Sequence, residues 1–276
     1  MLPQMLTTVK LRSMNSRIRS IAFAIGLVLF FLMGFGAKPV KVLLAGDSTM
    51  SDKPLTKSVK DAVSGETFEE PFLERGWGQL LPQFLNENAG VVNYARNGRS
   101  SRTFVEEGLW TELINNAGKG DFVIIQFGHN DEVPTKKSYT EPAQFRLNFV
   151  AFVNEVRAKG AYPILCTSVA RRKFDEQGNL VATHDEYPEI IRAVAKQENV
   201  PLIDMERITS EWLQNAGVEK SKSFFHKIAP GVSKLYPKGL DDDTHFNEKG
   251  AASVAEFFIR EVERQDIREF LKLIKK

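Results

Sequence analysis

The chain has 276 residues, of which 42% are hydrophobic and 26% charged, and its formal net charge at pH 7 is +2. This is the composition of an ordinary globular protein and excludes a low-complexity chain. The near balance of charges argues against a nucleic-acid-binding protein, which would carry a strong basic excess. No Pro-rich or Gly/Ser-rich linker divides the chain after residue 40, so we expect one domain over residues 37–276.

Residues 1–36 have the pattern of an export signal. An uncharged run from Ile21 to Ala37 has an apolar body of about the length of a signal-peptide h-region. Cleavage after Gly36 leaves small residues at both critical positions, whereas cleavage after Ala37 leaves Phe35 three residues back. The basic residues that precede the run are Lys10, Arg12, Arg17 and Arg19.

Two alternatives for this segment stay open. Met14 begins a more compact signal by itself, which would make residues 1–13 a misassigned start. The apolar run could also remain as an uncleaved membrane anchor, although it is short for a span. Removal of residues 1–36 takes four of the 37 basic residues and leaves 33 against 35 acidic ones. We expect an exported, periplasmic or extracellular protein without stable membrane association, and the sequence leaves its oligomeric state open.

The first element after this segment ends in a serine. The apolar run Val40–Ala45 stops at Gly46, Asp47 and Ser48, and predicts a buried strand that delivers Ser48 to the edge of a sheet. Ligands bind outside the carboxyl ends of such strands in α/β sheets. The alternative is that Asp47 and Ser48 only cap the next helix or close a turn.

The rest of the chain alternates between strand and helix patterns. The polar stretch Ser51–Glu70 has too little apolar periodicity for a core element and is predicted to be a long surface loop. Strands are predicted at 91–95, 121–127, 161–168 and 200–204, and helices at 76–86, 145–156, 187–198 and from 247 onward. Alternation of this kind indicates βαβ units and a parallel sheet covered on both faces. We therefore expect an α/β fold, a three-layer α/β/α sandwich.

Four polar clusters follow the predicted strands or precede the last helix. They are Asp47-Ser48, Asn97-Gly98, His129-Asn130-Asp131 and Asp242-Asp243-Thr244-His245. Acyl transfer at a serine needs a base, a group that orients the base, and donors for the developing oxyanion. The spacing of Asp242 and His245 allows both side chains to lie on one face of a first helical turn or a tight turn before it. Asp242 can then hold one imidazole nitrogen while the other faces Ser48.

In these blocks the sequence resembles the SGNH, or GDSL-type, hydrolases, which are named for Ser, Gly, Asn and His. Here these residues are Ser48, Gly98, Asn130 and His245, in the family's order. The resemblance extends from about residue 40 to about residue 262 and implies a flavodoxin-like, five-stranded parallel sheet. It also implies that Ser48 is the nucleophile, His245 the general acid/base and Asp242 its orienting carboxylate. The N–H groups of Ser48 and Gly98 and the amide of Asn130 would form the oxyanion hole.

Thr49 stands where the family's name has leucine. With Gly76-Trp77-Gly78, Arg96–Ser101 and Gly128–Asp131, this block resembles the rhamnogalacturonan acetylesterase branch, whose members remove acetyl groups from pectic polysaccharide. The resemblance implies a secreted serine esterase that deacetylates a polysaccharide or oligosaccharide through an acyl-enzyme, without a cofactor. Two alternatives are an SGNH esterase or lipase acting on another acetylated glycan or acyl ester, and a catalytically silent carbohydrate-binding module on the same fold.

Two residues beside these blocks are candidates for substrate binding. His129 adjoins Asn130 and could contact substrate, or it could fix the loop. Arg99 could offer positive charge to a galacturonate-containing polymer. His184 and His226 lie in no recognisable block and are interpreted as structural.

No metal site is expected from the sequence. The Asp241–Asp243 run does not match an EF-hand loop, because Phe246 stands where the loop needs glycine. Four scattered histidines and the single Cys166 give no zinc-ligand spacing. Cys166 lies in an apolar run and is interpreted as a small buried residue.

Overall fold

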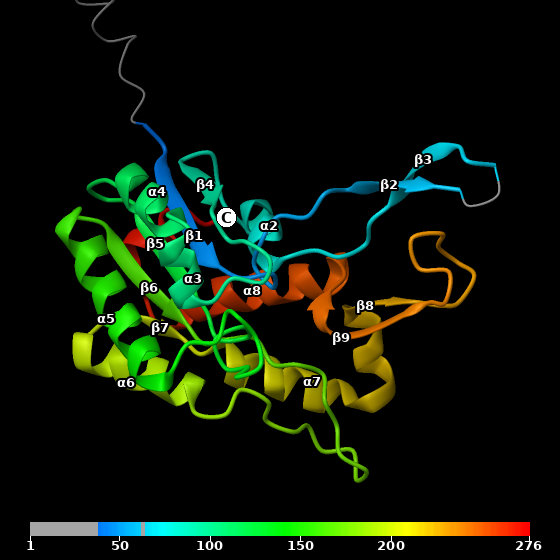
Figure 1. The fold of residues 1–276 in the computed structure, drawn as a ribbon. Coiled ribbons are helices and arrows are strands. Elements are labelled where there is room, and N and C mark those ends of the chain that lie inside the picture. The colour runs from blue at the N-terminus through cyan, green and yellow to red at the C-terminus, as the bar shows by residue number, and fades with distance from the viewer. Residues whose placement is uncertain (1–37, 62–63) are drawn as a thin grey trace, which may run out of the picture. The chain divides into compact units, whose positions relative to one another are not determined.

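A five-stranded parallel sheet lies at the centre of the fold, in the order β4-β1-β5-β6-β7 (Figure 1). The computed structural model describes residues 38–61 and 64–276; the interpretation of residues 1–36 as a signal lies outside this range. The strands are β1 (Val40–Gly46), β4 (Ala89–Asn93), β5 (Phe122–Gln126), β6 (Tyr162–Cys166) and β7 (Leu202–Ile203). All four pairings are parallel. This is the flavodoxin-like strand order.

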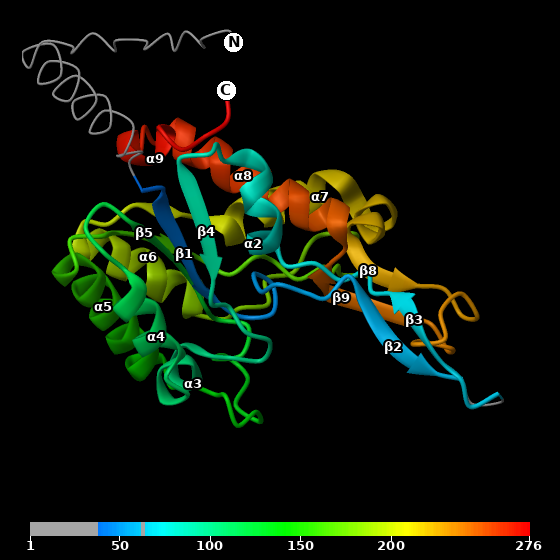
Figure 2. The ribbon, with the colours of Figure 1, turned by 90° about the horizontal axis from the view of Figure 1, so that it is seen from above.

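Helices cover both faces of the sheet, as Figure 2 shows from above. One layer contains α3 (Ser101–Glu106), α4 (Leu109–Asn116), α5 (Pro142–Ala158) and α6 (Tyr187–Glu198). The other contains α2 (Trp77–Leu80), α7 (Met205–Ser221), α8 (Glu248–Arg264) and α9 (Arg268–Leu271). Along β1, Leu43 faces the first layer and Val42 and Leu44 the second. The strands are apolar on both faces for this reason, and the predicted three-layer α/β/α sandwich is confirmed.

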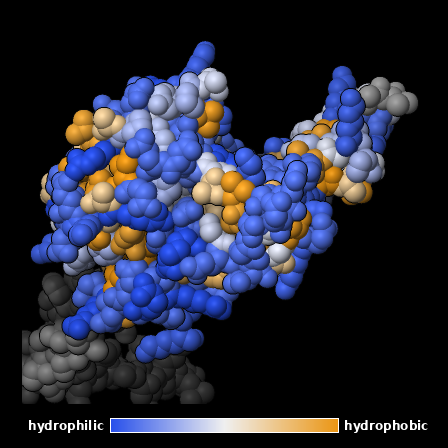
Figure 3. Space-filling view, turned by 90° about the horizontal axis from the view of Figure 1, so that it is seen from below, coloured by the Kyte–Doolittle hydropathy of each residue, from blue (hydrophilic) through white to orange (hydrophobic). Residues whose placement is uncertain are grey.

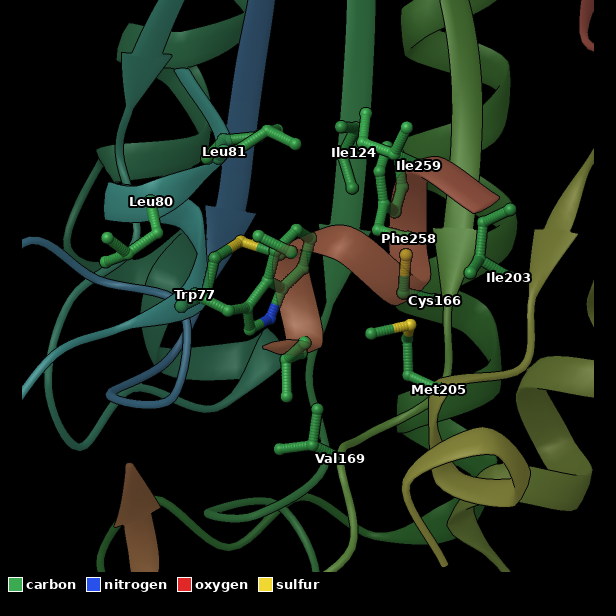
Figure 4. Packing of buried hydrophobic residues seen from close by; sticks show 14 of the residues in the cluster. Trp77, Leu80, Leu81, Ile124, Cys166, Val169, Ile203, Met205, Phe258 and Ile259 are labelled. Carbon is green, nitrogen blue, oxygen red and sulfur yellow. The ribbon is translucent and has the colours of Figure 1, made fainter. Parts of the chain in front are cut away.

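Figure 4 shows the core between the sheet and the second helical layer. Trp77 is fully buried there and stacks on Phe258 of α8, with 5.5 Å between ring centroids. Its indole N–H donates to Gln126 Oε1 over 3.0 Å, which satisfies the polar group inside the core. Cys166 is a free, fully buried thiol in the same cluster, and burial raises its pKa. Its interpretation as a buried structural residue is confirmed.

The predicted loop Ser51–Glu70 is wrong in part. It contains an antiparallel hairpin of β2 (Thr56–Lys60) and β3 (Thr67–Pro71) that projects from the sandwich (Figure 1). In both strands exposed residues alternate with half-buried ones, but each strand has only one apolar half-buried residue, Val59 or Phe68, so the sequence shows no apolar stripe. The projecting arm lies at the right of Figure 3 and carries apolar side chains beside hydrophilic ones.

The predicted helix at 76–86 is wrong in extent. The α-helix α2 ends at Leu80, and a 3₁₀ turn, η1 (Leu81–Phe84), follows with Pro82 near its start. Proline lacks the N–H that would continue the α-helical hydrogen bonds, which accounts for the change. A second 3₁₀ turn, η2 (Lys222–Phe224), follows α7.

A second antiparallel hairpin, absent from the sequence prediction, consists of β8 (Phe225–Ile228) and β9 (Leu240–Phe246). The helix α8 follows β9 directly. Asn247 caps α8, since its side-chain oxygen accepts the N–H of Gly250 over 3.0 Å. The predicted start of this helix near Asn247 is therefore confirmed, and the hairpin brings Asp242 and His245 to the sheet.

Candidate active site

Ser48 lies just beyond the carboxyl end of β1. The carbonyl of Asp47 accepts the N–H groups of Met50 (3.2 Å) and Ser51 (3.0 Å), so the chain turns sharply at this point. One carboxylate oxygen of Asp47 also accepts the N–H and hydroxyl of Thr49, over 2.9 and 2.8 Å. Asp47 thus closes the turn, whereas Ser48 remains partly exposed at the strand end.

Ser48, His245 and Asp242 form a continuous hydrogen-bonded chain. Ser48 Oγ is 2.8 Å from His245 Nε2, and His245 Nδ1 is 2.7 Å from Asp242 Oδ2. The other oxygen of Asp242 accepts the N–H groups of Thr244 (2.7 Å) and His245 (2.9 Å). These two bonds form a tight turn at the end of β9, before α8 begins. The structure therefore brings the three residues predicted from the sequence together.

The ionised carboxylate of Asp242 makes the imidazole of His245 a stronger base. Burial lowers the pKa of His245, but the hydrogen bond and charge of Asp242 outweigh burial, and the net pKa is raised. Burial acts to raise the pKa of Asp242, yet the hydrogen bond and charge of His245 hold it at about 2. With Nδ1–H donated to Asp242, Nε2 is left to accept the Ser48 proton.

Gly98 and Asn130 line one hollow of about 400 Å³ beyond the strand ends. Gly98 has a φ of +76°, in the left-handed region that favours glycine. The turn around Gly98 is tied to the Ser48 loop, because Ser51 Oγ donates to Asn97 Oδ1 over 2.7 Å. The Asn130 amide donates one N–H to the Arg99 carbonyl over 3.1 Å, which leaves its second N–H for another acceptor.

The Gly76-Trp77-Gly78 motif allows close packing beneath the Ser48 loop. A Cβ atom added at Gly76 would lie 2.2 Å from the carbonyl oxygen of Ser51, and one at Gly78 would lie 2.6 Å from that of Met50. The Trp77 N–H donates to the Thr49 carbonyl over 2.9 Å. Glycine is thus required at both positions because the backbone of the Ser48 loop comes too close for a side chain. The segment fixes the loop that carries the candidate nucleophile.

Comparison with known proteins assigns this chain to a family. The GDSL-like Lipase/Acylhydrolase family matches residues 44–252, which include Ser48, Gly98, Asn130, Asp242 and His245. The chain belongs to this family. It is accordingly a carboxylic-ester hydrolase, and the resemblance inferred from the four sequence blocks is confirmed.

Several relatives resemble this hydrolase over most of its length. It is 40% identical to rhamnogalacturonan acetylesterase RhgT of Bacillus subtilis, over 82% of this chain and 90% of the relative. It is 33% identical to the probable rhamnogalacturonan acetylesterase YesY of the same organism, over 78% and 88%.

Solved structures agree on the fold. Protein YXIM of Bacillus subtilis superposes with a TM-score of 0.68 at 26% identity, over 84% of this chain and 58% of that longer chain. The acetylxylan esterase Axe2 of Geobacillus stearothermophilus gives a TM-score of 0.53 at 19% identity, over 82% and 95%. The Axe2 likeness bears on the fold alone.

The structure does not bring His129 to the surface of this hydrolase. Its side chain is 3% exposed, and Nδ1 lies 3.5 Å from Asp47 Oδ2. Its ring packs edge-on against that of His184, with 4.5 Å between centroids. Burial lowers the pKa of His129 to about 4, against the opposing charge of Asp47, so it is neutral at pH 7. Its position therefore favours the loop-fixing alternative over substrate contact.

Arg99 lies at the rim of the hollow beside Gly98 and Asn130. Its Nε donates to Glu107 Oε2 over 2.8 Å and its Nη1 to the Asn97 carbonyl over 2.8 Å. The side chain remains 39% exposed. Arg99 thus stabilises the turn that carries Gly98 and also presents charge to the hollow.

His184 and His226 are both buried, in keeping with their structural interpretation. His184 contacts Glu132 Oε2 through Nδ1 (2.8 Å) and the Val169 carbonyl through Nε2 (2.9 Å). His226 Nδ1 lies 3.9 Å from Glu74 Oε2. Within residues 38–61 and 64–276, no group of three His, Cys, Asp or Glu side chains could hold a metal ion.

Sequence reasoning missed a buried ion pair beside the site. Lys53 Nζ lies 2.6 Å from Glu74 Oε1, with its side chain 1% exposed, and also donates to Asn97 Oδ1. Burial lowers the pKa of Lys53, although the charge of Glu74 opposes this. The pair connects the Ser48 loop, the Gly98 turn and the segment before Gly76. No motif or spacing in the sequence marks either residue.

Proposed function

We propose that this hydrolase removes acetyl groups from the pectic polysaccharide rhamnogalacturonan through an acetyl-enzyme intermediate. The hydrogen-bonded chain Ser48–His245–Asp242 is the observation that carries the chemistry. The substrate is supported by the 40% identity to a rhamnogalacturonan acetylesterase that spans nearly the whole relative.

In the first half-reaction Ser48 Oγ attacks the acetyl carbonyl carbon while its proton passes to His245 Nε2. Negative charge develops on the carbonyl oxygen and is stabilised by the N–H groups of Ser48 and Gly98 and by the free amide N–H of Asn130. Asp242 stays ionised and holds the imidazolium through Nδ1. The carbon–oxygen bond to the sugar then breaks, and the sugar oxygen leaves with the proton from His245.

The second half-reaction uses the same groups in reverse. His245 takes a proton from a water molecule, whose oxygen attacks the acetyl carbon on Ser48 Oγ. The same donors stabilise the second oxyanion, and its collapse returns the proton to Ser48. One acetate and one free sugar hydroxyl are the products, and no cofactor takes part.

The test is acetate release from acetylated rhamnogalacturonan, with acetylated xylan as the comparison substrate and the Ser48→Ala variant as the control. We expect a higher kcat/KM on rhamnogalacturonan and no release above background by the variant. Faster release from xylan would contradict rhamnogalacturonan as the preferred substrate and favour another acetylated glycan. Glycan binding without release from any ester would support a binding module instead. A burst of alcohol product ahead of steady state would test the acetyl-enzyme.

We also propose that the protein is exported and loses residues 1–36. The support is the pattern of four basic residues ahead of an uncharged apolar run that ends in small residues. Cell fractionation followed by N-terminal sequencing tests both parts. We expect Ala37 as the first residue of the exported protein. An intact N-terminus in a membrane fraction would contradict cleavage and favour an anchor.

A further inference from the structure

The hollow beside Gly98 and Asn130 has an unusual lining of charge. Its volume is about 400 Å³, and the other residues that line it are Arg99, Thr103, Glu107, Lys136, Lys137 and Ser138. Three of these carry positive charge and one carries negative charge. The single acid, Glu107, is already paired with Arg99.

The two lysines have no such counter-charge. Lys136 and Lys137 are exposed, and within residues 38–61 and 64–276 neither forms an ion pair with a carboxylate. Lys136 Nζ lies 3.4 Å from the Asn130 side-chain oxygen. The amine is thereby held beside the amide whose second N–H faces the reacting carbonyl in the proposed mechanism. The hollow therefore presents positive charge directly next to the oxyanion donors.

The backbone that carries these lysines is well fixed. The Lys136 N–H donates to the Val133 carbonyl over 3.0 Å. Arg102 of α3 donates to the Lys137 carbonyl over 2.6 Å, and Ser138 Oγ donates to the Asn130 carbonyl over 3.2 Å. These bonds tie the lysine turn to α3 and to the Asn130 loop, so the charged lining has a set position relative to the reacting centre.

We propose that this hollow is a subsite for the carboxylate of a uronate residue in the substrate. The inference rests on the proposed function, because the polymer must carry uronic acids beside its acetyl esters. Lysine ammonium groups and an arginine fork are the side chains that recognise carboxylates. A neutral glycan would offer no counter-charge to the two exposed ammonium groups, whereas a galacturonate supplies the missing negative charge. The subsite would orient the polymer through the unreacting part of the sugar chain.

The test measures binding and does not depend on catalysis. Full-length protein carrying Ser48→Ala is titrated with trigalacturonate, and the Kd is measured by calorimetry. Adding Lys136→Gln or Lys137→Gln should weaken binding about threefold each, and both together about tenfold, the range for partly exposed ion pairs. Raising the salt concentration from 0.05 to 0.5 M should weaken binding of the parent protein as well.

Lys159→Gln is the matched control. It removes the same charge from an exposed lysine that lies before β6, at the amino end of the strand and away from the carboxyl ends where the hollow lies, and should leave the Kd unchanged. A neutral trigalactoside should bind more weakly than trigalacturonate and equally to all variants. Equal affinity of the parent for the two trisaccharides, or an unchanged Kd in the double lysine variant, would overturn the subsite.

The two proposals can fail separately. Lysine-dependent binding of trigalacturonate by a protein that does not deacetylate rhamnogalacturonan would keep the subsite and overturn the proposed substrate. If the protein deacetylates rhamnogalacturonan but its affinity for trigalacturonate is unchanged by both lysine substitutions, the proposed substrate stands and the subsite is overturned.

Discussion

Two histidine–carboxylate pairs flank Ser48, and they differ in almost every physical respect. His245 is hydrogen-bonded to Asp242 at 2.7 Å and its side chain is 27% exposed, whereas His129 lies 3.5 Å from Asp47 and is 3% exposed. The pKa of His245 is raised, while burial lowers that of His129 to about 4. Both carboxylates have a pKa of about 2. The same two residue types thus give a base in one place and a neutral packing group in the other.

The difference teaches that burial without a direct hydrogen bond cancels the effect of a nearby carboxylate on a histidine. His245 exchanges water for a hydrogen bond to an ionised partner and for the hydroxyl of Ser48. His129 loses water without a comparable bond, because both of its ring nitrogens are buried and unpartnered within the described residues. Desolvation then outweighs the charge of Asp47.

A pair of glutamine variants gives the largest expected difference between the two histidines. His245→Gln removes the base and should lower kcat for an aryl acetate by a factor on the order of 10⁶, as expected for loss of a triad base. His129→Gln removes a buried neutral ring and should keep kcat within about tenfold. Circular dichroism of both variants checks that they fold. Equal losses would mean that both histidines act in the reaction.

Asp242→Asn should have the next largest effect, because an amide in place of the carboxylate disfavours the tautomer of His245 that accepts the Ser48 proton. We expect kcat to fall by about 10⁴. Asp241→Asn is the matched control, since this neighbouring carboxylate is 85% exposed and pairs only with Lys227 among the described residues. A comparable fall in the control would undo the assignment of Asp242.

Asn130 follows His129 in the sequence, but unlike His129 it lines the hollow. Substitutions at these two neighbouring positions should therefore differ in their effect on kcat. Asn130→Ala should lower kcat by about 10²–10³, the usual cost of one oxyanion donor, with little change in KM. Steady-state kinetics on the aryl acetate measure both constants. A nearly unchanged kcat would remove Asn130 from the oxyanion hole.

The pH profile of kcat/KM separates the two histidines without a loss of activity. The proposed mechanism requires neutral His245, whose pKa is raised by the hydrogen bond and charge of Asp242 above that of a free histidine, so activity should fall about tenfold per pH unit below that raised pKa. His129, with a pKa of about 4, should not contribute to this limb. His129→Gln should therefore leave its midpoint in place, and a shifted midpoint would show that His129 titrates in the working range.

The smallest effect concerns stability. Between pH 6.5 and pH 4 the unfolded chain binds a proton at His129 that the folded protein excludes, so this residue destabilises the fold as the pH falls. From pH 7 to pH 5 the loss amounts to about 2 kcal/mol. The free energy of unfolding is measured in urea at pH 7 and pH 5 for the parent protein and for His129→Gln. Its fall between the two pH values should be smaller in the variant by about the same amount. An identical fall in both proteins would contradict the buried neutral state.

The sequence predicted the central sheet because its parallel strands are continuous apolar runs, and it predicted α5, α6 and α8 from their apolar stripes. It missed the hairpins β2–β3 and β8–β9 because their strands are largely polar, so no apolar stripe in the sequence marks the buried positions. The helices α3, α4 and α7 were not predicted either. The extent of α2 depended on Pro82, whose effect on a helix varies with its position in the turn.

The candidate triad could be located from four ordered blocks, whereas its electrostatic surroundings could not. His129 packs against His184, which comes 55 residues later in the chain. Lys53 and Glu74 pair across segments that come together only when the protein folds. Lys136 and Lys137 look like any exposed lysines in the sequence. Their meaning comes from lying beside Gly98 and Asn130 in one hollow.

The bond between Ser48 and His245 joins residues 197 positions apart in the chain. A ribosome that adds 5–20 residues per second needs roughly 10–40 s to pass from the first of them to the second. In the proposed mechanism, the growing polypeptide during that time contains its nucleophile but lacks the base that activates the serine. The same mechanism predicts that any product of early termination before residue 245 is inert, so that hydrolysis would report that synthesis has passed the last hairpin.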